Sequence, residues 1–131
     1  MSATRTLHVE SVGAGPPLVL LHGWALHGGV FAPLLPALVA RHRVHVVDLP
    51  GHGHSPPIPG VTLDAVVDAV AGAIAQAGDD APADVLGWSF GGLVAQRWAA
   101  RGDARVGRVV FVCTSPRFVV GDGWTHGIAP Q

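Results

Sequence analysis

The sequence predicts an α/β fold in which a mainly parallel sheet is flanked by helices. Apolar segments of strand length alternate with segments of helix length along the chain. Continuous apolar runs such as "PLVLLHG" and "VHVVD" are typical of strands that are buried on both faces. Regular alternation of strand and helix favours parallel strands joined by right-handed crossovers. We therefore expect one unit, residues 1–131, without a linker or an internal repeat.

Composition and charge limit the classes of function. Apolar residues make up 49% of the 131 residues and charged residues 13%, which is typical of a packed domain rather than a disordered chain. The formal net charge of −1 gives no electrostatic reason to expect a nucleic acid or an anionic membrane surface as partner. The sequence shows neither the apolar core of a signal peptide nor an apolar run long enough to cross a bilayer. These features predict a cytoplasmic protein.

The residue pattern predicts five strands and three helices. Strands are expected at residues 6–9, 17–23, 44–48, 83–88 and 106–115, and helices at residues 31–40, 62–78 and 90–101. Thr62 is a good N-cap for the second helix, and Gly78 is expected to end it. Cys113, the single cysteine, lies in the last apolar run and is expected in the core. Residues 116–131 are rich in turn residues and predict no further helix.

The stretch "LGWSFGG" carries the strongest chemical signal. Gly87-Trp88-Ser89-Phe90-Gly91 matches G-x-S-x-G directly after a predicted buried strand and directly before a helix, which is the context of a nucleophile elbow. The turn is so tight that side chains two before and two after the serine would collide, so glycine is needed at both positions. The helix directs its N-terminal amides at the serine oxygen. Ser89 is the predicted nucleophile; the alternative is a glycine-rich turn with an incidental serine.

The tripeptide His22-Gly23-Trp24 follows the first buried strand and predicts half of an oxyanion hole. In enzymes with such an elbow, one backbone N–H comes from the residue after the nucleophile, here Phe90, and another from the loop after an earlier strand, here Trp24. Trp24 and Trp88 are also expected to wall an acyl pocket. The alternative is that the tripeptide only ends a strand.

The segment from Asp48 to Ser55 follows the second buried strand. Its His52 and His54 form an H-x-H pair, but without carboxylates or thiolates at coordinating distance this is a weak metal signal, and neither a metal nor another cofactor is expected. Asp48 is expected to accept hydrogen bonds from loop amides, and the two histidines are expected to be solvated. Asp48 precedes the serine, whereas the elbow fold uses the chain order nucleophile, acid, histidine.

The triad acid and base that would activate Ser89 are predicted to be missing from this chain. After Ser89 the acidic residues are Asp103 and Asp122, and the histidine is His126. Asp103 is expected at the opposite end of the sheet from the serine. Asp122 and His126 are expected on the correct side, but a glycine-rich tail offers no rigid support for catalytic geometry. The sequence is therefore expected to be truncated.

Four segments resemble a known family. They are "LLHGWALHGGVF", "VVDLPGHGHS", "LGWSFGGLVAQ" and "SPRF…DGWTHGIAP". With the same spacing from about residue 18 onward, they are similar to the α/β-hydrolases that cleave pimeloyl-[acyl-carrier protein] methyl ester in biotin synthesis. The resemblance implies the N-terminal half of an α/β-hydrolase fold, with the lid and the C-terminal strands absent.

The same resemblance implies an activity and a partner. It implies a serine carboxylesterase without a cofactor, in which Ser89 is the nucleophile and Trp24 and Phe90 line the substrate. The implied substrate is an acyl ester carried on acyl carrier protein, and the full-length enzyme is expected to be a monomer.

Other interpretations remain open. Dehalogenases and epoxide hydrolases place aspartate at the elbow, so Ser89 argues against both. Carbon–carbon hydrolases, menaquinone-pathway lyases and aminopeptidases share the serine. A further alternative is an inactive fragment or binding remnant that retains half a hydrolase sheet. The last strand is expected to leave an apolar sheet edge unpaired, so the chain alone is expected to be poorly soluble and inactive.

Overall fold

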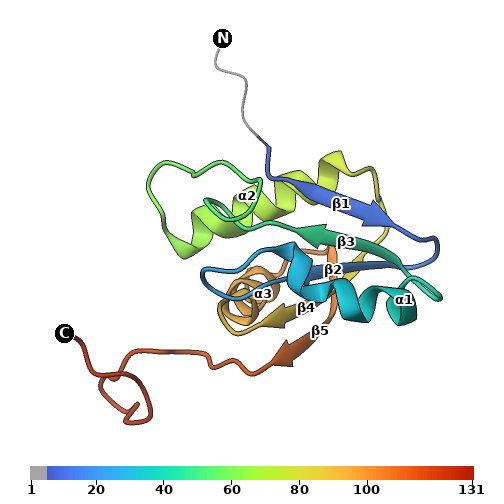
Figure 1. Cartoon of the computed structure of the whole chain (residues 1–131). Helices are drawn as coiled ribbons and strands as arrows, with labels where there is room; N and C mark the ends of the chain where they lie inside the picture. Colours follow the sequence, from blue (N-terminus) through green and yellow to red (C-terminus); the bar gives the residue numbers. More distant parts are fainter. Residues whose placement is uncertain (1–5) are drawn as a thin grey trace.

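The computed structural model describes residues 6–131, which form a five-stranded sheet with helices on both faces (Figure 1). The strands are β1 (Val9–Val12), β2 (Pro17–Leu21), β3 (Arg43–Val47), β4 (Ala83–Trp88) and β5 (Val106–Val112). The helices are the 3-10 helix η1 (Gly28–Leu34), α1 (Leu35–Leu38), α2 (Leu63–Gln76) and α3 (Phe90–Ala100). The strand order is β1-β3-β2-β4-β5, and only β1 is antiparallel to its neighbour. The predicted mainly parallel α/β fold is confirmed.

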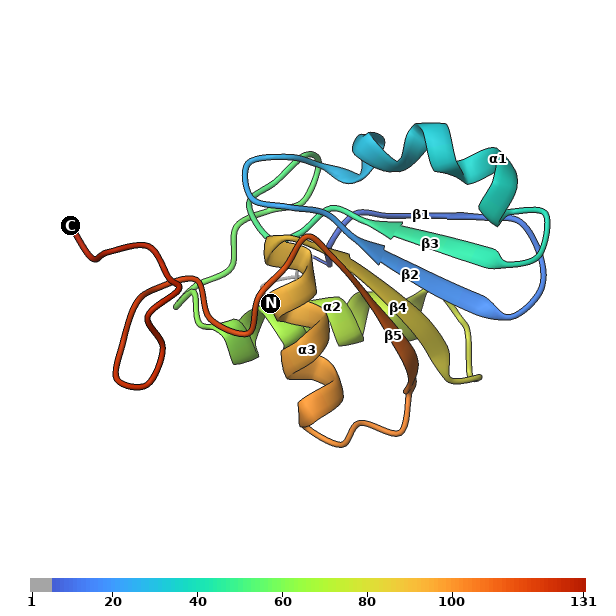
Figure 2. The same ribbon diagram turned by 90° about the horizontal axis from the view of Figure 1, so that it is seen from below.

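Strand β2 is buried on both faces, as its continuous apolar run predicts. Val19 and Leu21 belong to a cluster that includes the inner faces of α2 and α3. Leu18 and Leu20 point to the other face and pack with Phe31 of η1. Figure 2 shows α1 on one side of the sheet and both longer helices on the other. Because each face has its own helical layer, neither set of side chains along β2 needs to be polar.

Helix α2 begins and ends where its capping residues predict. The Oγ1 of Thr62 accepts a hydrogen bond from the Ala65 N–H at 3.1 Å, and Thr62 itself has extended backbone angles. Gly78 follows the helix with φ +87°, a conformation that glycine adopts without a steric cost. Local chemistry therefore sets both ends of this helix.

Two predicted elements lie elsewhere than expected. The first strand begins at Val9, not at residue 6, because pairing with β3 sets its position: Val9 lies opposite Val47. The helix predicted at residues 31–40 is a 3-10 helix followed by a single α-helical turn. Pro33 and Pro36 both lie within this segment. Pro33 falls in the first turn of the predicted helix, where it is tolerated, but Pro36 removes the N–H that a continuous α-helix would bond to the Ala32 carbonyl.

The last strand, β5, lies at an edge of the sheet, and the core position expected for Cys113 is wrong. Among residues 6–131 its one strand neighbour is β4. Val110 and Phe111 are 48% and 52% exposed, so this edge is apolar, as the sequence predicts. Cys113 follows the strand with φ +47° and is exposed. An apolar run predicts burial only where a second layer covers it, and the outer part of β5 has none among the described residues.

Loss of the α2 cap should be measurable as a loss of stability. Thr62→Ala removes the hydroxyl that accepts from Ala65 and should lower the free energy of unfolding by about 1 kcal/mol. Thr62→Ser keeps an acceptor and should stay within about 0.5 kcal/mol of the parent. Urea denaturation followed by circular dichroism measures both, and equal stability of the two variants would contradict the role of the cap.

Candidate active site

Ser89 occupies a strained turn between β4 and α3. Its backbone angles are φ 54° and ψ −116°, a combination that costs a non-glycine residue on the order of 1–3 kcal/mol. The end of β5 holds it there: the Ser89 N–H donates to the Val112 carbonyl at 2.9 Å, and the Ser89 carbonyl accepts from Thr114 Oγ1 at 2.7 Å. Ser89 is half-buried, and its side chain does not cap α3. The Ser89 hydroxyl is therefore not used to stabilise the N-terminus of α3.

Glycine is sterically required on both sides of Ser89. A Cβ on Gly87 would collide with the backbone of Gly91 and Gly92. A Cβ on Gly91 would collide with the carbonyl oxygen of Leu21 at the end of β2. Glycine is therefore required at both positions, as the sequence predicts. At Gly91, however, a side chain would collide with the neighbouring strand β2 and not with the turn itself. The absence of a Cβ at both positions lets the first turn of α3 pack directly against the sheet.

The loop after β2 lies against this turn. A Cβ built on Gly23 would lie 3.5 Å from the Cβ of Ser89. The rings of Trp24 and Phe90 meet edge to face, with centroids 5.6 Å apart. Within residues 6–131, neither the Trp24 N–H nor the Phe90 N–H donates a hydrogen bond. Two free backbone donors therefore lie on the two segments that meet at Ser89, which suits stabilisation of an oxyanion.

His22 joins this loop to the one after β3. Its side chain is fully buried; Nδ1 donates to the Gly23 carbonyl at 2.7 Å, and Nε2 accepts from the Leu49 N–H at 2.9 Å. A carbonyl can only accept and an amide can only donate, so the ring is neutral and protonated on Nδ1. Burial lowers the pKa of His22, and the hydrogen bond to Gly23 offsets this only in part.

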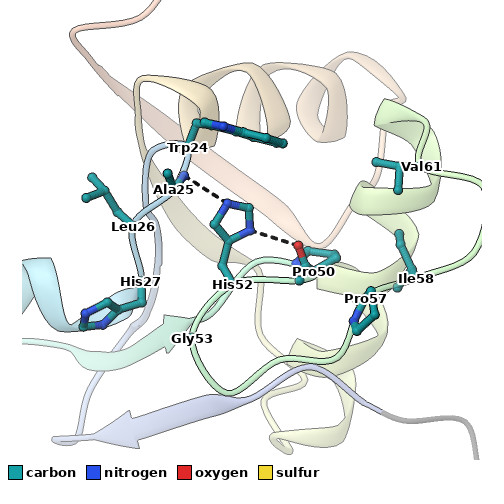
Figure 3. A pocket seen from close by; sticks show the side chains of 11 residues that line it. Trp24, Ala25, Leu26, His27, Pro50, His52, Gly53, Pro57, Ile58 and Val61 are labelled. Atoms are coloured by element: carbon teal, nitrogen blue, oxygen red, sulfur yellow. Dashed lines mark hydrogen bonds between the residues drawn. The ribbon is translucent and has the colours of Figure 1, made fainter.

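His52 makes the reciprocal connection, and the expectation that it is solvated is wrong (Figure 3). Its Nδ1 donates to the Pro50 carbonyl at 2.9 Å, and its Nε2 accepts from the Ala25 N–H at 3.1 Å. The ring is half-buried and lies 5.3 Å from that of Trp24. His54 is exposed, as expected. The meeting of the two loops could have been anticipated, because parallel neighbouring strands end at the same edge of a sheet.

Asp48 fixes the start of the loop after β3, as expected from the sequence. Its Oδ1 accepts from the Gly28 N–H at 2.7 Å and its Oδ2 from the His54 N–H at 2.9 Å. Burial raises the pKa of Asp48, but these two hydrogen bonds outweigh it and hold the pKa below its usual value. Asp48 is thus a buried carboxylate that binds the first backbone amide of η1 and a backbone amide of the loop after β3.

A cavity of about 490 Å³ opens beside the loop after β2 (Figure 3). Trp24, Ile58 and Val61 give it apolar walls, and Trp24 and Val61 are 69% and 72% exposed. Trp88 does not line this cavity, so the expectation that both tryptophans wall one pocket is wrong: Trp88 packs against the cluster that includes Phe31. Along β4 its side chain points to the η1 face of the sheet.

Asp103, Asp122 and His126, the acids and the histidine that follow Ser89 in the sequence, do not form a triad with it. Asp103 precedes β5 and accepts hydrogen bonds from Trp98 Nε1 and from Arg105, and the bonds from Arg105 hold the pKa of Asp103 far below its usual value. Asp122 and His126 are exposed on a segment that runs away from the sheet in both views (Figures 1 and 2). Among the described residues, no carboxylate or imidazole is hydrogen-bonded to the Ser89 hydroxyl.

Comparison with known proteins identifies the family. Residues 16–128 match the family model described as alpha/beta hydrolase fold. The chain belongs to the α/β-hydrolase family. Within residues 6–131, none of the helices of this hydrolase is long and apolar enough to span a membrane.

Curated relatives in this family carry one name. The chain is 52% identical over 123 residues to the "Pimeloyl-[acyl-carrier protein] methyl ester esterase" of Chromobacterium violaceum. This alignment covers 94% of this chain and 46% of that protein. It is 46% identical over 125 residues to the protein of the same name in Stenotrophomonas maltophilia, with 95% and 46% covered. The chain therefore spans about half the length of the curated relatives it matches. The resemblance drawn from the motifs is confirmed.

Solved structures confirm the fold. An esterase from Exiguobacterium antarcticum superposes with a TM-score of 0.86 at 27% identity, covering 94% of this chain and 47% of the esterase. The enol-lactonase from Burkholderia xenovorans superposes with a TM-score of 0.77 at 30% identity, covering 85% and 44%. The described strands and helices correspond to about half of each hydrolase.

The close approach of α3 to the sheet should be sensitive to a single methyl group. Gly91→Ala places a Cβ against a β2 carbonyl and should lower the free energy of unfolding by at least about 2 kcal/mol. Gly72→Ala in α2 meets open space and should raise it by about 0.5–1 kcal/mol. Chemical denaturation measures both changes. A Gly91 variant as stable as the parent would show that the elbow is not sterically constrained.

Burial of neutral His22 should make stability depend on pH. The folded-state pKa lies below the ordinary value of 6.5, so at intermediate pH the unfolded chain binds a proton that the folded chain does not. The free energy of unfolding should therefore fall as the pH drops from about 7.5 to about 5.5. The fall should be smaller in His22→Gln and unchanged in His54→Gln, as measured by urea denaturation at each pH. Identical pH profiles for all three proteins would contradict the assignment.

Proposed function

We propose that this chain is part of a serine carboxylesterase that hydrolyses pimeloyl-[acyl-carrier protein] methyl ester in biotin synthesis. The observation that carries the proposal is Ser89 in its strained turn, with the free amides of Trp24 and Phe90 on the two segments beside it. The substrate is proposed from the 52% identity to the Chromobacterium violaceum esterase. Residues 1–131 form the N-terminal part of its hydrolase domain, and the whole enzyme is a cytoplasmic monomer in this proposal.

The proposed mechanism proceeds through an acyl-enzyme. The Ser89 oxygen attacks the ester carbonyl while a histidine accepts its proton. The N–H groups of Trp24 and Phe90 stabilise the oxyanion, and methanol leaves with the proton returned by the histidine. Water then attacks the acyl-enzyme and releases the acid. In this proposal the histidine and its carboxylate partner belong to the half of the hydrolase domain that the chain does not span.

The cavity beside Trp24 supports an acyl substrate. Its apolar walls, formed with Ile58 and Val61, suit a chain of methylene groups. The Trp24 ring contacts both Phe90 and the cavity, so a chain bound there would extend from the oxyanion amides. We therefore place the pimeloyl chain in this cavity.

The alternative is an inactive fragment or a binding remnant. The observation that favours it is the position of Asp122 and His126, which are exposed on a segment that leaves the sheet. Related serine hydrolases of the carbon–carbon hydrolase, menaquinone-pathway lyase or aminopeptidase type share the elbow geometry and differ in the substrate they turn over.

A hybrid enzyme tests the proposal. This chain replaces the matching segment of the Chromobacterium violaceum relative, whose remaining half then supplies the acid and base. The hybrid should hydrolyse pimeloyl-[acyl-carrier protein] methyl ester, and Ser89→Ala should lower kcat by at least about 10³-fold because the nucleophile is lost. Ser115→Ala, at a partly buried serine whose hydroxyl bonds only to the Arg117 backbone among the described residues, should leave kcat unchanged within about twofold. Steady-state release of methanol measures all three.

Two outcomes would contradict this proposal. Unchanged turnover in the Ser89 variant would discard Ser89 as the nucleophile. Serine-dependent hydrolysis of a p-nitrophenyl ester without turnover of the pimeloyl ester would keep the chemistry and discard the substrate.

A further inference from the structure

We propose that His52 is a positioning residue for the oxyanion hole. It holds residues 23–26, here called the oxyanion loop, in a strained conformation through the hydrogen bond from the Ala25 N–H. The inference rests on the proposed function, because it matters for catalysis only if the Trp24 amide binds an oxyanion. It assigns a task to a side chain that the proposed mechanism does not use.

The oxyanion loop is strained at the residue after Trp24. Ala25 has φ +63°, in the left-handed region that a residue with a Cβ adopts only at an energetic cost. One bond that holds it is local, from the Leu26 N–H to the Gly23 carbonyl at 3.3 Å. The other comes from a residue 27 positions away: the Ala25 N–H donates to His52 Nε2 at 3.1 Å. A strained residue persists only where its surroundings fix it, and His52 is the distant group that does so.

The His52 ring is prepared to accept this bond. Its Nδ1 donates to the Pro50 carbonyl at 2.9 Å, so the proton resides on Nδ1 and Nε2 carries the free lone pair. The backbone of His52 is held by a bond from its N–H to the Leu49 carbonyl at 2.9 Å. Contacts with the rings of His22 and Trp24, at 5.2 and 5.3 Å between centroids, fix the ring plane.

The two histidines connect the same two loops in opposite directions. His22 of the loop after β2 accepts from the Leu49 N–H of the loop after β3. His52 of the loop after β3 accepts from the Ala25 N–H of the loop after β2. The pair therefore fixes both the separation of the loops and the direction of the peptides around Trp24.

The expected kinetic signature is a fall in kcat. An oxyanion donor acts on charge that develops in the transition state, so a misdirected amide lowers kcat and leaves KM nearly unchanged. Complete loss of one donor costs about 10²–10³-fold. Loosening the loop without removing the amide should cost less, about tenfold.

Three variants separate the hydrogen bond from other effects. His52→Phe keeps an aromatic ring beside Trp24 but has no acceptor. His52→Gln restores an acceptor at the position of Nε2. His54→Gln is the matched control, because it removes a histidine from the same loop whose ring accepts nothing from the oxyanion loop.

Amide hydrogen exchange in the hybrid enzyme measures the bond itself. Exchange at Ala25, followed by NMR, should be about tenfold faster in His52→Phe, and close to the parent rate in His52→Gln and His54→Gln. An unchanged rate in His52→Phe would overturn the proposal, as would a Gln variant that exchanges as fast as the Phe variant.

Kinetics of the hybrid enzyme measure the consequence. His52→Phe should lower kcat about tenfold with KM within about twofold, and His52→Gln should recover most of the loss. A raised KM with unchanged kcat would overturn the positioning role. Failure of the proposed function gives a different result, because the parent hybrid then shows no turnover that depends on Ser89. In that case the exchange rate of the Ala25 amide still shows whether His52 holds the oxyanion loop.

Discussion

The candidate site depends on how closely the first turn of α3 approaches the ends of β2 and β4. Without a Cβ at Gly87 and Gly91, the helix presses against strand backbone on two sides. The chain then passes from strand to helix through one residue, and Ser89 takes up the strain at φ 54° and ψ −116°. The end of β5 holds that residue by its N–H and its carbonyl. Any group that moves α3 outward would relax Ser89 and withdraw the Phe90 amide from the loop after β2.

Two different kinds of force thus build one site. Steric contact fixes the elbow, where there is no space for alternatives. Hydrogen bonds fix the facing loop, where His22 and His52 each accept an amide from the opposite segment. A hydrogen bond in a partly buried site is costly to leave unmade, so the loop holds its shape only while both rings accept these amides. The elbow therefore depends chiefly on close packing, whereas the facing loop depends on two side-chain acceptors.

The same distinction explains what the sequence could predict. The elbow and the ends of α2 were predictable because glycine sterics and the Thr62 cap act over a few residues. The start of β1, the exposure of Cys113 and the bonds of His52 were not, since each depends on a partner that is distant in the chain. From the sequence alone, His52 could be interpreted only as a solvated residue or a weak metal ligand. Its acceptor role appears once two parallel strands bring their following loops together.

In the proposed mechanism, the groups that residues 6–131 contribute act mainly through the backbone. The Ser89 turn and the amides of Trp24 and Phe90 are set by the sheet and its loops, and they need no titrating side chain at the serine. Proton transfer does need one, and among residues 6–131 no such group is bonded to the serine hydroxyl. In the proposed mechanism, stabilisation of the oxyanion and activation of the nucleophile are therefore separate tasks. Because electrostatic stabilisation works only when the donors are preorganised, the proposed mechanism gives the contacts that hold the two loops a role in catalysis even though they touch no substrate.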